Sequence, residues 1–219
     1  MKRRTTVISA IAAIALLGGG TATAVAVSGD DGAGSSSSNT ARQSSVQVKD
    51  DDGVSDKQEE INEAKGAKVK AEDAIAAALK HTPGTAVGAD LDSDDGRLVW
   101  EVDVIGSGDK WQHVDVDPGN GKVLGSHTER DDDGDDSAAR VAATLKDAST
   151  SAEDAAKAAG SKGTVTSVDA DDDGSVKVWE VETTSSNGTQ HDWHVDFKSG
   201  AVTADHASDD DGQDDGDDD

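Results

Sequence analysis

The sequence predicts an α+β protein built from two small modules, each a helix packed on a short antiparallel β-sheet. One observation behind this prediction is that an apolar helical face precedes alternating strand residues, and the other is that these blocks occur twice in the same order. Glu101 and Glu180 hold the same place in "VWEVDV" and "VWEVET", 79 residues apart. The duplication therefore predicts two modules of one fold rather than a longer array of repeats.

The composition limits what such modules can bind. The chain has 219 residues and a formal net charge of −26 at pH 7. Nucleic acids and anionic lipid surfaces attract clustered Lys and Arg, so this charge argues against both and favours cations or basic proteins as partners. Aromatic residues make up 2% of the chain and cysteine is absent. We therefore expect small aliphatic cores and neither a disulfide nor a thiolate metal site.

The N-terminus has the pattern of an export signal. The positive stretch "KRR" precedes an apolar run from Val7 to Val27, and small residues near the end of this run offer cleavage sites. The run also reaches the ~20 residues that a membrane-spanning helix needs. Residues 1–27 are therefore predicted to be a signal peptide or an uncleaved membrane anchor. Either one places the rest of the chain outside the cytoplasmic membrane, with membrane contact limited to this segment.

Polar and acidic segments separate the predicted modules. Residues 28–58 and 130–137 are predicted to be disordered linkers, and residues 208–219 a disordered acidic tail. Their Ser, Gly and Asp residues bury too little apolar surface to offset the entropy of ordering, and their like charges repel. The two modules are then predicted to span residues 59–129 and 138–207.

Each module is predicted to begin with a helix. In the first module, apolar residues from Ala71 to Leu79 recur at helical spacing, and "HTPG" ends the helix because the residue before Pro83 disfavours the α region. In the second module, Thr150 and Glu153 form a predicted capping box ahead of a face made of alanines. Alanine side chains bury little area, so we expect the second module to be less stable.

Strands follow each predicted helix. In "RLVWEVDV" the apolar residues alternate with polar ones, which places Trp100 and its counterpart Trp179 in the core. "HVDV" and "HVDF" alternate in the same way, and "DPGNGK" and "KSG" are predicted hairpin turns. A helix on one side of each antiparallel sheet leaves the other side open.

The first module resembles the PepSY domain. The resemblance rests on the helix "AEDAIAAALKHTPG", an acidic Asp-Gly turn, the strand "VWEVDV" and the segment "HVDVDPGNGKV", in this order. Residues 151–206 look like a degenerate copy that lacks the proline and the long aliphatic residues of the helix. PepSY units occur in propeptides of secreted metallopeptidases and in free-standing envelope proteins. The resemblance implies a restraining or modulating role toward a peptidase in trans, with no catalytic residues to carry over.

The stretch "DADDDGSVKVWE", from Asp169 to Glu180, matches the calcium-loop pattern of an EF-hand. Strand-like residues flank it, Lys177 stands where an oxygen ligand is usual, and the first module shifts the glycine by one position. An acidic hairpin turn explains the spacing better. The alternative is a weak calcium site at Asp169, Asp171 and Asp173, in an acidic envelope protein that holds divalent cations. No other cofactor is expected.

Ionisable residues are expected on the open face of both sheets. The alternation places His113 and Asp115 in one module, and His194 and Asp196 in the other, away from the helix. With the glutamate of each "WEV" strand they could hold a divalent ion, but a solvated sheet face explains them as well. Trp111 shares the face in the first module, where an exposed indole suits a partner contact. The predicted partner-binding residues are Trp111, His113, Asp115, His194 and Asp196.

The sequence carries no constellation typical of an enzyme. It lacks the H-E-x-x-H, G-x-S-x-G and P-loop patterns, and its Asp pairs lie in predicted turns and tails. We predict an exported, non-enzymatic protein that binds and modulates, or inhibits, a secreted or envelope peptidase. The predicted recognition surface is the open sheet face or a free edge strand.

Overall fold

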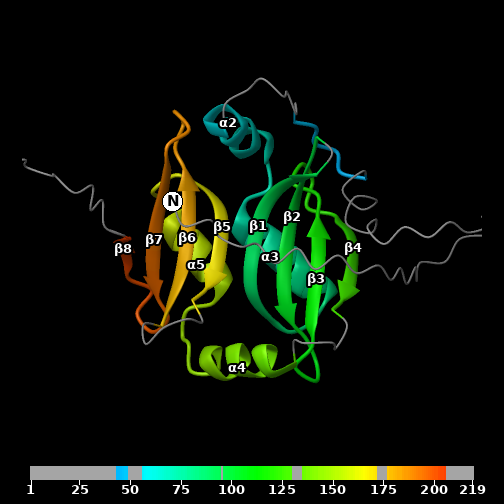
Figure 1. The fold of residues 1–219 in the computed structure, drawn as a ribbon, viewed down its shortest axis with the longest axis vertical. Helices are drawn as coiled ribbons and strands as arrows, with labels where there is room; N and C mark the ends of the chain where they lie inside the picture. Colours follow the sequence, from blue (N-terminus) through cyan, green and yellow to red (C-terminus); the bar gives the residue numbers. More distant parts are fainter. Residues whose placement is uncertain (1–42, 49–55, 95, 130–134, 172–176, 206–219) are drawn as a thin grey trace, which may run out of the picture.

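The computed structural model describes residues 43–48, 56–94, 96–129, 135–171 and 177–205 (Figure 1). The first repeat comprises α2 (Asp56–Gly66), α3 (Ala71–His81), β1 (Thr85–Asp94), β2 (Arg97–Ile105), β3 (Trp111–Val116) and β4 (Val123–Thr128). The second comprises α4 (Asp135–Leu145), α5 (Ala152–Ala159), β5 (Thr164–Ala170), β6 (Val178–Thr184), β7 (Gln190–Asp196) and β8 (Val202–Ala204). The predicted α+β class with antiparallel strands is confirmed.

The strands of both repeats form one continuous sheet, in the order β4-β3-β2-β1-β5-β6-β7-β8 (Figure 1). The sequence predicts two short sheets, but β1 and β5 pair antiparallel and join them. The pairs are Gly88 with Asp169, Ala89 with Val168, and Asp90 with Ser167. Strands β1 to β4 of the first repeat run outward from the centre in the same order as β5 to β8 of the second. An approximate twofold axis at the Ala89–Val168 pair therefore relates the repeats. One such unit of about 60 residues is marginal alone, which favours joining.

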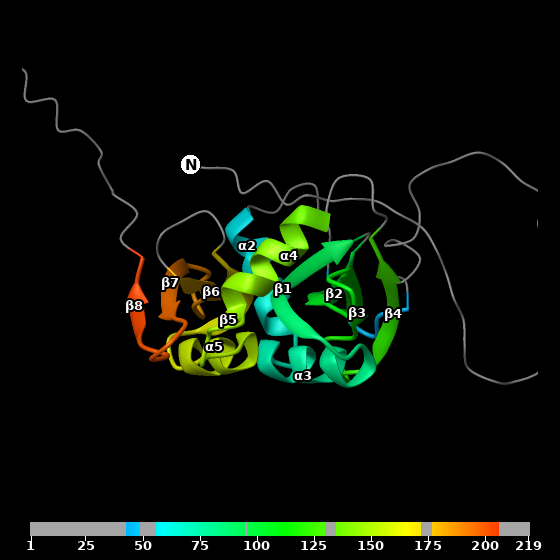
Figure 2. The same ribbon diagram turned by 90° about the horizontal axis from the view of Figure 1, so that it is seen from below.

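Helices α3 and α5 lie side by side on one face of the sheet (Figure 2). Their buried residues are Ala71, Ala74, Ile75 and Ala78 in α3, and Ala152, Ala155, Ala156 and Ala159 in α5. The capping box of α5 is formed by Ser151 and Asp154, one residue later than the predicted pair of Thr150 and Glu153. Small side chains on both helices let their backbones approach each other closely.

The two tryptophans predicted for the core hold equivalent places in the repeats. Trp100 on β2 and Trp179 on β6 are each 1% exposed. Their indole N–H groups donate to the backbone oxygens of Val69 and Thr150, each at 3.0 Å, just ahead of α3 and α5. Each strand is thereby tied to the start of its helix, and the buried N–H is satisfied.

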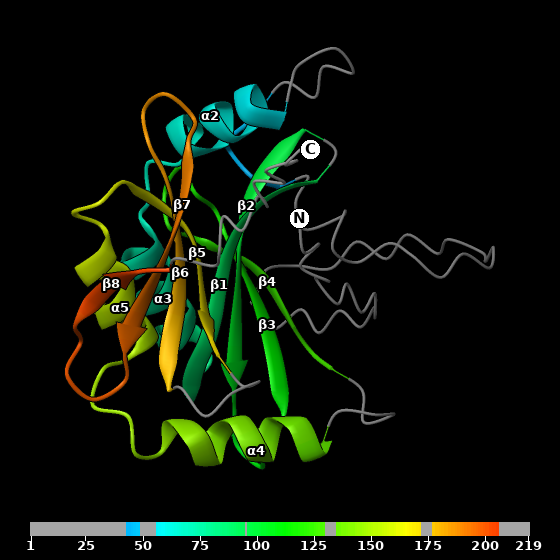
Figure 3. The same ribbon diagram turned by 60° about the vertical axis from the view of Figure 1, so that its left-hand side comes forward.

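Helices α2 and α4 were not expected from the sequence. They lie at opposite ends of the strands (Figures 1 and 3), and both begin inside segments predicted to be linkers. On α4, the side chains of Ala138, Val141 and Leu145 are buried. Their spacing of three and four residues makes one apolar helix face. The acidic run around them hides this short face in the sequence.

Residues 43–48 also fall in the predicted linker, yet they run along the start of β2. The Val48 N–H donates to the Gly96 oxygen at 2.9 Å, and the Leu98 N–H donates to the Val46 oxygen at 3.1 Å. The Ser44 hydroxyl is buried and donates to the Leu98 oxygen at 2.6 Å. Because β3 pairs with β2 only from Trp100 onward, this segment satisfies backbone groups that β3 leaves open.

Two glycines give matched tests of the packing. A methyl group at Gly84 would overlap the backbone oxygen of Ile105 and lie 2.6 Å from Val104 Cγ1, whereas at Gly160 the nearest atom is 3.4 Å away. We expect Gly84→Ala to lower the free energy of unfolding by about 1–3 kcal/mol. We expect Gly160→Ala, at a helix end, to change it by less than about 1 kcal/mol. Urea denaturation measures both, and equal losses would contradict the close packing at Gly84.

Candidate functional site

The face of the sheet opposite α3 and α5, called the open face, carries rows of ionisable side chains. Paired residues on adjacent strands project to the same side of a sheet. In the first repeat one row crosses β1, β2 and β3 as Asp90, Glu101 and Asp115. In the second repeat the equivalent row crosses β5, β6 and β7 as Asp169, Glu180 and His194. The open face is therefore polar, as alternation predicts.

The two rows meet at the seam, which we define as the three paired positions of β1 and β5. Asp90 and Asp169 hold equivalent places, 79 residues apart, and lie diagonally across it. A Cβ on Gly88 would lie 2.8 Å from Asp169 Oδ1, so the missing side chain gives this carboxylate its room. The Ser167 hydroxyl donates to Asp169 Oδ2 at 2.7 Å. The repeat offset could have matched these aspartates, but not placed them on neighbouring strands.

Burial and repulsion change the acid strength of two carboxyls in these rows. Burial, and next the charge of Asp169, raise the pKa of Asp90 from 3.8 to about 8. Burial, and next the charge of Asp115, raise the pKa of Glu101 from 4.5 to about 7. Asp90 is therefore mainly protonated at neutral pH. The centre of the open face carries less negative charge than the sequence suggests.

A stacked histidine pair lies at the β3–β4 side of the open face. His113 Nδ1 is 2.6 Å from Asp103 Oδ1, and its ring centroid is 4.7 Å from that of His127. Burial lowers the pKa of His113, but the hydrogen bond to Asp103 and the charges of Asp103 and Glu129 outweigh it, so the net pKa is raised. Burial, and next His113, lower the pKa of His127. One ring is thus biased toward the cation and its neighbour toward the neutral form.

The two histidines predicted as equivalent occupy different places in the repeat. "HVDV" and "HVDF" suggest that His113 and His194 correspond, but the register pairs His113 with Asp103 and His194 with Glu180. His194 therefore takes the place of Asp115. Its Nε2 lies 4.0 Å from Glu180 Oε1 and 3.7 Å from a carboxylate oxygen of Asp205. The loop between β2 and β3 has the same length as the loop between β6 and β7, so residues 79 positions apart stay equivalent through β3 and β7. The two "HVD" motifs are 81 positions apart, and the sequence match between them is therefore not a structural match.

Asp196 lies at the end of β7, where its carboxylate serves a turn. Asp196 Oδ1 accepts from the N–H groups of Lys198 and Ser199, at 3.1 and 2.8 Å, and from the Ser199 hydroxyl at 2.7 Å. The hydrogen bonds from Ser199 are the main cause of a lowered pKa at Asp196. Asp117 does the same in the first repeat, where its Oδ1 accepts from the Gly119 N–H at 2.7 Å. The carboxylate of Asp196 therefore stabilises the turn, whereas His194 lies near the carboxylates of Glu180 and Asp205.

The other predicted site residues are distributed along the strands. Trp111, expected to be exposed, is half-buried at the start of β3 and packs against the core. Asp115 is 5% exposed beside Glu101. Asp171 follows β5, and Asp173 lies outside the described residues. In the part of the chain that the structure describes, no group of three or more His, Asp or Glu side chains could hold a metal ion.

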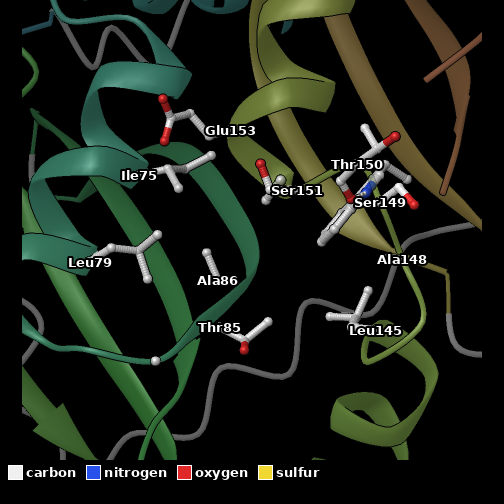
Figure 4. Close-up of a pocket in the computed structure, with 13 residues that line it drawn as sticks. Ile75, Leu79, Thr85, Ala86, Leu145, Ala148, Ser149, Thr150, Ser151 and Glu153 are labelled. Carbon is white, nitrogen blue, oxygen red and sulfur yellow. Dashed lines mark hydrogen bonds between the residues drawn. The ribbon is translucent and has the colours of Figure 1, made fainter. Parts of the chain in front are cut away.

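Two grooves lie between the repeats. One of about 330 Å³ has Ile75 and Leu79 of α3 on one side and residues 148–151 on the other, with Leu145 of α4 at its end (Figure 4). The second, of about 350 Å³, holds the equivalent place near the end of α2. Each groove combines residues of both repeats, so both depend on the seam.

The segment predicted to be a signal peptide or membrane anchor, residues 1–27, lies outside the described residues, as does the predicted tail at 208–219. Among the helices that the structure describes, none is long and apolar enough to span a bilayer.

The pKa of Asp90 predicts how stability depends on pH. The folded protein keeps the Asp90 proton up to about pH 8, whereas the unfolded chain releases it near the ordinary value of 3.8. This contribution to stability is therefore complete below that value and is lost as the pH rises toward 8. Asn does not ionise, so Asp90→Asn removes this loss of stability at high pH. We expect it to raise the melting temperature by roughly 5 °C or more near pH 8.5, and to change it much less near pH 4.

The control for this measurement is Asp109→Asn, which removes the same charge from an exposed loop residue. Its melting temperature should follow that of the unchanged protein at every pH, apart from a constant offset. If Asp90→Asn and Asp109→Asn gave the same pH dependence as the unchanged protein, the raised pKa of Asp90 would be disproved.

Comparison with known proteins gives the chain its family. The PepSY model, described as "Peptidase propeptide and YPEB domain", matches residues 68–127 and 150–206. No curated protein matches. Among solved structures, a candidate lipoprotein from Clostridium difficile 630 is 24% identical, with 63% of this chain and 91% of that chain covered and a TM-score of 0.39. PepSY membership indicates a propeptide-like or regulatory role outside the cytoplasm. The two matched segments make up more than half of the sequence, and the chain belongs to the PepSY family.

Proposed function

We propose that this chain is an exported, non-catalytic PepSY protein that binds and modulates a peptidase at the cell surface or in the envelope. The observation that carries the proposal is the open face of the sheet, on which neither α3 nor α5 packs. Helices α3 and α5 pack on one side of the sheet (Figure 2). The other side carries the ionisable rows, and β4 and β8 are the edge strands among the described residues. Family membership supports the regulatory role, and the open face and edges supply a surface for a protein partner.

The outer half of the first repeat is the part of this surface that fits an extended peptide best. Its edge strand β4 has six residues, whereas the equivalent edge strand β8 has three. An extended peptide gains affinity from main-chain hydrogen bonds along the edge and specificity from the side chains beside it. His127 of β4 stacks on His113 of the neighbouring strand β3, and His113 is in turn close to the carboxylates of Asp103 on β2 and Glu129 after β4. We propose that Trp111, His113 and Asp115 belong to this recognition surface.

The second repeat contributes a smaller and differently charged surface. His194 lies between Glu180 and Asp205, and the short β8 offers fewer backbone groups to a partner. We propose that His194 and Asp196 take part only at its margin. The predicted signal peptide or anchor at residues 1–27 and the acidic segments that separate the modules remain part of the proposal. The signal peptide or anchor places the recognition surface outside the cytoplasm. The acidic segments attract basic partners.

The calcium alternative receives less support. The predicted ligand Asp169 hydrogen-bonds Ser167 at the seam, so it is drawn toward Asp90 rather than toward the hairpin end. No metal-holding group of three side chains occurs among the residues that the structure describes.

Inhibition assays on the peptidases that the same cell secretes test the proposal. The mature protein is mixed with each peptidase, and residual activity and complex formation are measured. Asp103→Lys reverses a charge beside His113 on β2, and Asp192→Lys makes the same change on β7, where Asp192 holds the place of His113. We expect Asp103→Lys to weaken inhibition about tenfold, as for the loss of one good contact, and Asp192→Lys to leave it unchanged.

Two results would count against this proposal in different ways. If no peptidase of the set were inhibited or bound, the proposed function would fall. If inhibition occurred but Asp192→Lys weakened it and Asp103→Lys did not, the function would stand and the assignment to the first repeat would be overturned. Circular dichroism of both variants confirms that the fold is intact.

A further inference from the structure

Residues 43–48, which we call the strap, fill a site that the first repeat builds beside the start of β2 (blue in Figure 1). The strap runs antiparallel to β2. The Leu98 N–H donates to the Val46 oxygen at 3.1 Å, and the Leu98 oxygen accepts from the Ser44 hydroxyl at 2.6 Å. The Arg97 guanidinium donates to the Ser44 oxygen at 2.9 Å. The strap is therefore held as a short added strand.

A proline makes this place available in the first repeat. Pro118 and Phe197 are equivalent, 79 residues apart. The Phe197 N–H donates to the Lys177 oxygen at 3.1 Å, so the second repeat continues its own strand pairing beyond β7. Proline has no N–H, and the equivalent oxygen, that of Leu98, takes the Ser44 hydroxyl instead. The first repeat thus leaves to the strap a position that the second repeat fills with its own backbone.

The turn before β4 binds the second serine of the strap. Asp117 Oδ1 accepts from the Ser45 hydroxyl at 2.8 Å, and Asp117 Oδ2 accepts from the Ser45 N–H at 3.1 Å. A Cβ on Gly119 would overlap Ser45 Oγ and lie 2.9 Å from Val46 Cγ2, whereas the second repeat has Lys198 at the equivalent position. The carboxylate and the missing side chain together select a small hydroxyl residue.

The two valines of the strap face the core. Val46 and Val48 are half-buried and pack against it, while Ser45 and Gln47 are exposed between them. A Cβ on Gly66, the last residue of α2, would lie 3.3 Å from Val46 Cγ1 and 3.5 Å from Val48 Cγ1. The site therefore suits an extended segment in which apolar residues stand one and three positions after a small hydroxyl residue.

We propose that the first repeat carries a strand-addition site for an extended partner peptide with this pattern, and that the strap is the occupant the chain itself supplies. The groups that select the pattern belong to the folded repeat: the backbone of Leu98, the carboxylate of Asp117 and the space at Gly119. A partner segment with the same residues makes the same bonds when it takes the place of the strap. The inference holds for any protein partner and does not require a peptidase.

The strap controls access to this site. An occupant on the same chain competes at an effective concentration in roughly the millimolar range. The apparent affinity for a partner is reduced to the fraction of chains whose strap is out of the site. A change that weakens the strap therefore increases the affinity for a partner, although the site itself is unaltered.

Binding of the strap sequence as a separate peptide tests the proposal. The probe is a fluorescent peptide of residues 43–48 with blocked ends, and a scrambled peptide of the same composition is the control. Anisotropy measures binding to the full mature chain and to a strap-weakened chain with Ser44→Ala and Val46→Ala, which lose the bond to Leu98 and the contact at α2. We expect the strap-weakened chain to bind the probe at least about tenfold more tightly than the parent. Neither chain should bind the scrambled peptide.

A further substitution in the strap-weakened chain tests the site itself. Gly119→Ala places a methyl group where the hydroxyl of the bound serine lies and should weaken probe binding by at least about tenfold. Gly160→Ala, at a position whose nearest atom is 3.4 Å away, should leave binding unchanged. Circular dichroism confirms that each variant is folded.

Four outcomes would overturn the proposal. One is a folded strap-weakened chain that does not bind the probe up to on the order of 1 mM. Another is a parent that binds the probe as tightly as the strap-weakened chain, and a third is binding that Gly119→Ala does not weaken. The fourth is a parent dimer, seen by light scattering, that the probe dissociates, because a second copy would then occupy the site. None of these measurements involves a peptidase, so they leave the test of the proposed function separate.

Discussion

The pairing of β1 with β5 is the contact on which the rest of the structure depends. Through three residue pairs it joins two four-stranded halves into one sheet. It brings α3 beside α5 and creates the two grooves between the repeats. A half sheet with one small helix buries little apolar surface, and the alanine faces of both helices make each half weaker still. Association of the halves adds the buried area that neither has alone.

The seam illustrates how one pair of strands can serve two environments. Alternation sends Ala89 and Val168 into the core and sends Asp90, Asp169 and Ser167 to the open face. Because β1 pairs with its own counterpart β5, equivalent residues of the two copies meet across an approximate twofold axis. An aspartate harmless on a solvated strand becomes one of a repelling pair when its own copy is placed beside it. Burial then favours the neutral form, and the seam gains its acid–base behaviour.

The two repeats share a backbone but have diverged on their outer strands. Their turn aspartates, Asp117 and Asp196, accept N–H groups in the same way, and Gly121 and Gly200 share a left-handed conformation in those turns. The open faces differ, because His113 of the first repeat corresponds to Asp192 of the second. The edge strands differ in length as well. The repeats therefore share a scaffold, while the side chains on their surfaces differ.

Local patterns in the sequence determined much of the molecule. Apolar spacing located α3 and α5, alternation located the "WEV" strands and their buried tryptophans, and Asp-Pro-Gly and Lys-Ser-Gly marked the turns before β4 and β8. These features depend on residues a few positions apart, so a single sequence contains them. Helix α4 escaped notice because its apolar face is only three residues long and begins in an acidic run. The short "HVD" motif wrongly predicted that His113 and His194 are equivalent. Strand pairing, and not this three-residue match, sets which residues correspond.

The tertiary structure alone decided how the repeats meet. Nothing in either copy specifies that β1 pairs with β5, since that choice depends on the summed burial of two halves and not on any local motif. The same choice placed Asp90 beside Asp169 and gave Gly88 its role as the space for a carboxylate. The sequence by itself determined the two units, with helices α3 and α5, most of the strands and the turns, through short-range periodicity. Their junction and its unusual acid came from contacts between residues about 80 positions apart, which only the folded chain brings together.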